Sequence, residues 1–166
     1  MGVVLNTDFV GKYELNVNQF NEDLIDAYIL KYENYYLTQL LGSELSTLFI
    51  ADLTAGIPSD ASYLLIFNQL SYDSNYEVVR SNGIKEMLIG FIYYHYIKDE
   101  SQIQTSTGTV STKGENSNKM MLNNITNSRF NDSVESFEAI QTYIEDNRVT
   151  YPTYNGQTVK LNYFFS

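Results

Sequence analysis

The sequence predicts a mainly α-helical protein, built as a small helical bundle with one long C-terminal helix, a protruding β-hairpin loop and an extended C-terminal hairpin and tail. Its 166 residues are about the length of one domain. Hydrophobic residues make up 43% and charged residues 18%, which is a globular composition. Apolar side chains recur at helical spacing over most of the chain. Because the chain contains no cysteine, disulfides and thiolate metal sites are excluded, and packing must stabilise the fold.

The first segment, residues 1–17, is expected to be an extended arm, because its apolar residues alternate with glycine and polar residues without a helical period. A helix follows, capped by Asn18 or Asn21 and closed by Gly42. Its apolar positions cover more than one face. We therefore expect this helix to contact a second surface besides the core.

Two short helices are expected next. One covers about residues 43–53, and the other begins at a Ser59 cap after Gly56 and Pro58 break the chain. Residues 71–82 are polar and poorly periodic, so the sequence predicts mostly loop there.

The helix over residues 82–98 is predicted to be the centre of the bundle, because apolar side chains nearly encircle it. Gly90 lies inside this helix, where glycine costs about 1 kcal/mol relative to alanine. Close approach of a neighbouring backbone would explain its presence.

The segment from Ser101 to Asn118 consists mainly of Ser, Thr, Gln, Gly and Asn, so it cannot fill a core. Thr107-Gly108 lies between two stretches of high β propensity, which predicts a protruding two-stranded hairpin over residues 102–113. A helix over residues 119–147 follows, roughly 43 Å long at about 1.5 Å per residue. Polar residues 126–129 interrupt its apolar stripe and predict a kink or a departure from the core.

The last segment, residues 148–166, is predicted to form a hairpin and an aromatic tail. The sequence Tyr154-Asn155-Gly156-Gln157 is typical of a two-residue turn. Direct pairing would place Thr150 opposite Leu161, with Tyr163, Phe164 and Phe165 exposed beyond the paired strands. The chain thus divides into an arm (1–17), a helical domain with its protruding loop 101–118 (18–147) and a tail (148–166).

Tyrosine is unusually frequent, with 15 Tyr, 9 Phe and no Trp. This residue is favoured where one end of a side chain is packed and the other is wet, as at protein–protein interfaces. An AT-rich coding sequence would raise the tyrosine content equally well. The sequence leaves both explanations open.

No reaction centre is evident, so we expect no enzyme, no metal and no cofactor. His95 is the only histidine, and its aromatic surroundings predict a packed or hydrogen-bonded helix residue. No serine lies in a Gly-x-Ser-x-Gly turn, and the acidic residues Glu22, Asp23 and Asp26 are explained by the helix macrodipole. Asp73 to Glu77 resembles the start of a calcium loop but lacks the required glycine.

Charge and hydropathy limit the partners further. The formal net charge of −10 argues against a surface that grips DNA or RNA, since such surfaces are built from Lys and Arg. The longest apolar run, residues 87–97, is too short to cross a bilayer, and no signal peptide is evident. We expect a soluble protein that makes no membrane contact.

The order of elements from about residue 20 to 150 is the most informative pattern. It comprises a Tyr- and Leu-rich helix ending in Leu40-Leu41-Gly42, a helix ending in Tyr93-Tyr94-His95-Tyr96, the loop Thr105 to Val110 leading to Glu115-Asn116-Ser117, and a long helix ending in Tyr143 to Asn147. This arrangement resembles the head–tail connector (adaptor or neck) proteins of tailed bacteriophages.

The resemblance implies a structural virion protein of the head–tail junction, made in the host cytoplasm. Such proteins are helical subunits that form a homo-oligomeric ring, commonly of twelve copies, between the portal protein and the next tail or neck component. The ring extends the DNA channel. With an acidic wall, double-stranded DNA would pass through the lumen without specific binding.

A ring needs a heterologous interface, in which two different faces of a subunit meet. The residues that we predict at this interface lie on the first long helix and on the last one, namely Tyr28, Tyr32, Tyr35, Tyr36, Phe130 and Phe137. The residues that we predict to dock the tail or a neighbouring subunit lie on the protruding hairpin, namely Ile103, Thr105, Thr107, Gly108, Thr109 and Val110. The aromatic end, Tyr163, Phe164 and Phe165, is predicted to dock on the portal.

Two other classes remain as alternatives. A carbohydrate-binding or adhesion module of a phage or bacterial surface would use tyrosine faces for sugar stacking, although such modules are usually β-rich. A hydrolase would require a pocket at His95 with a nucleophile beside it.

Overall fold

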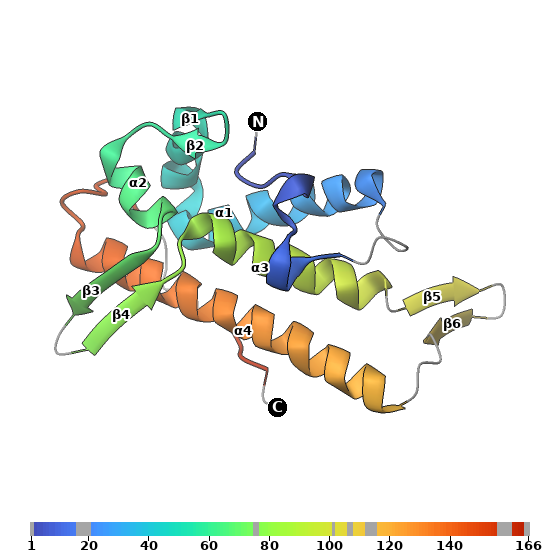
Figure 1. The fold of residues 1–166 in the computed structure, drawn as a ribbon. Coiled ribbons are helices and arrows are strands. Elements are labelled where there is room, and N and C mark those ends of the chain that lie inside the picture. The colour runs from blue at the N-terminus through green and yellow to red at the C-terminus, as the bar shows by residue number, and fades with distance from the viewer. Residues whose placement is uncertain are drawn as a thin grey trace.

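Helices form most of the protein, as the sequence predicts, and the computed structural model in Figure 1 describes residues 2–15, 21–74, 77–100, 102–105, 108–111, 116–155 and 161–164. These described residues form four α-helices, namely α1 (Glu22–Asp52), α2 (Ala61–Phe67), α3 (Ile84–Glu100) and α4 (Asn116–Asp146). They also form three antiparallel two-stranded sheets, each in a connection between successive helices. None of the helices in these described ranges combines the length and apolar character needed to cross a bilayer.

Helix α1 is two helical segments joined at a kink. Asn21 caps its start, because the side-chain Oδ1 accepts a hydrogen bond from the Leu24 N–H at 3.1 Å. At Gly42 the backbone leaves the helical region, with φ 77° and ψ 168°, a conformation that favours glycine. The predicted helix end at Gly42 and the predicted short helix over 43–53 are therefore both confirmed.

The N-terminal segment packs on the bundle, which corrects the expectation of an extended arm for residues 2–15. It forms two short 3₁₀ turns, Asn6–Asp8 and Gly11–Tyr13. Val3, Val4 and Tyr13 are buried in the same core as the helices. Apolar residues without a helical period can thus belong to a tightly packed irregular segment.

A small hairpin and a short helix follow α1. Strands β1 (Leu53–Thr54) and β2 (Ile57–Pro58) pair, and Asp60 rather than Ser59 caps α2, through a bond from the Ser62 N–H. The Asp52 carboxylate holds the approach to α2 by accepting bonds from the N–H groups of Ser59 and Asp60 at 2.7 and 2.8 Å.

Strands β3 (Leu70–Ser74) and β4 (Glu77–Ser81) form an antiparallel hairpin where the sequence predicts loop, so that prediction is wrong. The hairpin lies beside the C-terminal part of α4 (Figure 1). At its end the Asn82 N–H donates to Ser136 Oγ of α4. Contact with α4, which lies far along the chain, stabilises strands whose own sequence is weakly periodic.

Helices α3 and α4 form the centre of the bundle. A Cβ atom at Gly90 would overlap Ser133 Oγ of α4 and lie 3.2 Å from the Arg129 carbonyl oxygen, which confirms the expected close approach of a neighbouring backbone. Helix α4 continues without a break through residues 126–129, and Thr126 is buried there. The expected kink or departure from the core is therefore absent.

The predicted protruding hairpin is present as β5 (Gln102–Thr105) and β6 (Gly108–Ser111), with Gln102 paired to Ser111. It extends from the end of α3 away from the bundle (Figure 1). The predicted C-terminal hairpin is different. Residues 147–155 and 161–164 contain no strand, so Thr150 and Leu161 do not pair as expected, and Gly156 to Lys160 lie outside the described residues.

Candidate assembly surface

The tyrosines of α1 that the sequence assigns to a subunit interface mostly face α3. The Tyr32 ring stacks on His95 at 3.9 Å between centroids and an interplanar angle of 4°. The Tyr36 hydroxyl lies 2.9 Å from His95 Nε2, and Tyr28 donates to the Asp99 carboxylate at 2.7 Å. These contacts join α1 to α3 within one chain.

Three residues of the predicted interface are core residues, which corrects that assignment. Tyr36 is 4% exposed, Phe130 8% and Phe137 0%. Tyr36 stacks on Phe91 at 4.0 Å, and both phenylalanines pack edge-on against the same Phe91 ring. Tyr36 and Phe137 are therefore not available to a neighbouring subunit, and the Phe130 ring is covered by Phe164 of the same chain.

Tyr35 is the only aromatic residue with an exposed side chain in the part of the chain that the structure describes, at 51%. The other described tyrosines are buried or half-buried, and several direct the hydroxyl to a polar group. Tyr151, for example, donates to the Ser62 carbonyl oxygen at 2.7 Å. Tyrosine suits such positions because its ring packs against apolar side chains while its hydroxyl bonds a polar group.

His95 is a stacked and hydrogen-bonded helix residue, as the sequence predicts. Burial lowers the pKa of His95 to about 4, against a smaller opposing effect of Asp99. Burial also raises the pKa of Tyr36. At neutral pH the His95 imidazole and the Tyr36 phenol are therefore both uncharged. Their hydrogen bond joins two neutral side chains that pack together between α1 and α3.

A buried carboxylate on α1 holds the N-terminal segment. Glu33 is 9% exposed, and its two carboxylate oxygens accept bonds from the N–H groups of Val3 at 3.0 Å and Val4 at 2.9 Å. Gly2 lies so close that a Cβ atom there would be 2.6 Å from Glu33 Oε1. Sequence reasoning missed this residue, although Glu33 falls at helical spacing between the apolar Ile29 and Leu37.

The N-terminal segment and the two halves of α1 enclose an open groove of about 550 Å³, which we call the apolar groove. Its lining includes three apolar side chains that are exposed, Leu30 at 79%, Leu5 at 44% and Ile50 at 39%. Asp26 and Asn34 also line it. Sequence reasoning missed this surface because the kinked α1 and the packed N-terminal segment bring together residues that lie far apart in the chain.

The protruding hairpin carries the predicted docking residues on paired backbone. Ile103 pairs with Val110, Thr105 pairs with Gly108, and Thr109 pairs with Gln104. Thr107 lies outside the described residues. Since the sheet has two strands, the outer edge of each strand pairs with no other strand among the residues that the structure describes.

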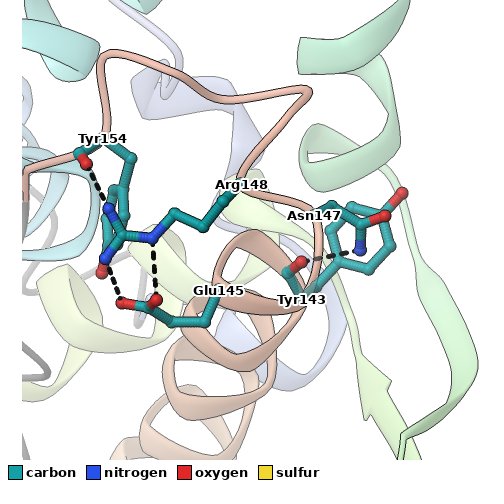
Figure 2. Close-up of polar contacts among 5 residues, drawn as sticks. All are labelled: Tyr143, Glu145, Asn147, Arg148 and Tyr154. Atoms are coloured by element: carbon teal, nitrogen blue, oxygen red, sulfur yellow. Dashed lines mark hydrogen bonds and ion pairs between the residues drawn. The ribbon is translucent and has the colours of Figure 1, made fainter.

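The end of α4 and the chain that follows it are firmly connected (Figure 2). Arg148 makes a two-bond ion pair with Glu145, and its Nη1 donates to the Tyr154 carbonyl oxygen at 2.6 Å. The Asn147 side chain donates to the Tyr143 carbonyl oxygen at 2.8 Å. Tyr154 is buried, so residues 147–154 belong to the body of the protein.

The aromatic end is not free, which corrects the expectation for Tyr163 and Phe164. Both are half-buried and pack against the core of their own chain. Phe164 stacks on Tyr94 of α3 at 5.2 Å, and the Tyr163 hydroxyl donates to Glu138 of α4 at 2.8 Å. Phe165 lies outside the described residues.

In the described ranges, no group of three or more His, Asp or Glu side chains is placed to hold a metal ion. Comparison with known proteins gave no matching family model, no similar curated protein and no similar solved structure.

Proposed function

We propose that this chain is a structural virion protein that forms a homo-oligomeric ring between the portal and the tail of a tailed bacteriophage. The observation that carries the proposal is the apolar groove. Exposed leucine and isoleucine side chains gather there on one surface, while the histidine and almost all described aromatic rings are used inside the fold. A protein organised in this way is suited to association.

The apolar groove offers a substantial association energy. Leu30, with 79% of its side chain exposed, lies beside the exposed Leu5 and Ile50. Burial of one such side chain contributes about 1.5–3 kcal/mol. Apolar side chains gathered on one surface are typical of protein–protein contact sites.

Ring closure requires a second, different face, and the hairpin β5–β6 supports one. It extends from the bundle and presents strand edges that pair with no other strand in the described part of the chain. An edge of this kind can add to a neighbour's backbone through main-chain hydrogen bonds. In the proposed ring, it reaches an adjacent subunit or the next tail component.

The charge of the chain fits the proposed DNA channel. Each copy carries a formal net charge of −10, so a ring of copies repels the phosphate backbone. Screening limits this repulsion to about 8 Å at physiological salt, which permits a narrow channel. DNA would therefore pass the acidic wall without adhering to it.

The alternative of a carbohydrate-binding module lacks support in the described part of the chain. Sugar stacking needs exposed aromatic faces, and Tyr35 alone provides one there. One exposed ring does not make a platform of several.

The proposal is tested by measuring the mass of the purified protein and of two variants by mass photometry. We expect a discrete ring for the wild type and a monomer for Leu30→Asp, because a charge in the apolar groove opposes its burial. Leu65→Asp is the matched control, since Leu65 is 49% exposed on α2 and does not line the groove. A wild-type protein that stays monomeric at every concentration, alone and with portal protein, contradicts the proposal.

A further inference from the structure

The segment Leu161 to Phe164 packs against both α3 and α4, on a surface that we call the peptide groove, and one side chain of α4 holds its backbone. Asn131 Oδ1 accepts a bond from the Phe164 N–H, and Asn131 Nδ2 donates to the Phe164 carbonyl oxygen, both at 2.8 Å. A neighbouring β-strand makes the same pair of bonds to one residue. Asn131 is therefore built to hold an extended peptide.

The side chains of Tyr163 and Phe164 in the bound segment are recognised by separate contacts. The Phe164 ring packs on Tyr94 at 5.2 Å and on Phe130 at 5.0 Å. Tyr163 donates its hydroxyl to Glu138 at 2.8 Å. The groove thus accepts an aromatic ring beside Asn131 and a phenol one position earlier.

Phe164 forms part of the wall of an open pocket. The pocket has a volume of about 260 Å³ and is also lined by Tyr94, Ile97 and Asn127. Lys98 Nζ lies 5.9 Å from the centroid of the Phe164 ring, within cation–π range. The site therefore offers both an aromatic wall and unfilled volume.

The segment in the groove is a second anchor, separate from the first. Residues 147–154 are fixed to the end of α4 by the contacts of Arg148 and Tyr154 (Figure 2). The chain from Tyr154 to Leu161 can span up to about 23 Å at roughly 3.3 Å per residue. Exchange of the second anchor between molecules therefore requires a neighbouring groove within about 23 Å of Tyr154.

We propose that the groove formed by Tyr94, Phe130, Asn131 and Glu138 is a binding site for an extended peptide that carries a Tyr-Phe pair, and that its occupant in the assembly is the C-terminal segment of a second copy of this chain. Every copy carries the same groove and the same segment, so exchange between neighbours keeps each contact and adds a link between subunits. The identity of the occupant rests on the proposed function, whereas the peptide site itself does not.

Peptide binding is tested in the full-length Tyr163→Ala/Phe164→Ala variant, whose own segment has lost its side-chain contacts. A fluorescent peptide of residues 157–166 is expected to bind saturably, as measured by anisotropy, and a scrambled peptide is not. Adding Asn131→Ala should weaken binding at least tenfold. Adding Asn124→Ala, an exposed asparagine earlier on α4, should leave it unchanged. Binding that is absent, or that is indifferent to Asn131→Ala, overturns the site.

Exchange between copies is tested by mixing two variants. Tyr163→Ala/Phe164→Ala supplies only the groove, and Asn131→Ala supplies only the segment. Each alone is expected to assemble less than the wild type, and their mixture is expected to form mixed oligomers by mass photometry. Full assembly of each variant alone, or no recovery on mixing, overturns the exchange. A wild type that does not assemble contradicts the ring instead, and leaves the anisotropy result to decide the peptide site.

Discussion

The hairpins β3–β4 and β5–β6 are similar in length but are held in different ways. The first lies against α4, where the Tyr72 ring packs edge-on against Tyr143 at 5.0 Å and the Tyr72 hydroxyl donates to Asp146 at 3.3 Å. The second continues from α3 and extends away from the bundle (Figure 1). Its strands are rich in Ser, Thr and Gln.

This difference shows two routes to a β-hairpin in one chain. A two-stranded hairpin by itself is marginally stable in water. Contacts with α4 stabilise β3–β4, although the sequence of this hairpin predicts loop. The hairpin β5–β6 is instead predicted by its own turn signal and by strands of high β propensity. We therefore expect the bundle to depend on the first hairpin, and assembly to depend on the second.

The largest effect is expected at Gly83, where the chain passes from β4 into α3. Its φ is +88°, and a Cβ atom would overlap the Phe67 carbonyl oxygen. Gly83→Ala should lower the free energy of unfolding by more than about 3 kcal/mol, measured by urea denaturation. Gly11→Ala is the control, because Gly11 has φ +61° with open space around it, and should lose only about 1–2 kcal/mol. Equal losses of unfolding free energy in the two variants would show that the backbone between β4 and α3 is not tightly packed.

A smaller effect is expected from Tyr72→Ala, which removes the contact of β3 with α4. The loss should be about 2 kcal/mol, because an aromatic pair and a partly buried ring disappear. Val78→Ala on β4 is the control, since Val78 is 56% exposed, and should change stability by less than about 0.5 kcal/mol. If both variants unfold at the wild-type urea midpoint, the hairpin does not depend on α4.

A pH effect of about 1 kcal/mol is expected from His95 on α3, the helix that joins the two hairpins, because its partial exposure to solvent reduces the effect well below the full pKa difference. Its folded-state pKa is lowered from 6.5 to about 4, chiefly by burial, so the unfolded chain binds the proton more readily. Stability should therefore fall as the pH drops from 6.5 toward 4. Urea midpoints of the wild type and His95→Phe across this range give the contribution as their difference, and parallel curves would contradict it.

The smallest effect on stability is expected from the protruding hairpin. Replacing residues 102–111 with a Gly-Ser linker of equal length should change the free energy of unfolding by less than about 0.5 kcal/mol, since a loop of that length closes at similar entropy. The same variant should lose the ring in mass photometry. A large loss of stability would place this hairpin in the fold and end the contrast with β3–β4.

Local patterns predict the helices and the protruding hairpin well. The cap at Asn21, the break at Gly42 and the close approach at Gly90 each follow from the chemistry of a single residue type. The direction of side chains on a helix with several apolar faces does not follow in this way. Tyr35 and Tyr36 are neighbours in sequence, yet one is 51% exposed and the other 4%.

The sequence by itself determined the helical class, the order of the helices and the acidic charge, because these depend on periodicity, caps and composition. The tertiary structure alone decided that Tyr36, Phe130 and Phe137 are buried, that Leu5, Leu30 and Ile50 meet in the apolar groove, and that Asn131 holds the backbone of Phe164. The reason is physical. Helical periodicity shows which residues share a face, but only the packing of distant segments determines which faces are covered and which remain open to a partner.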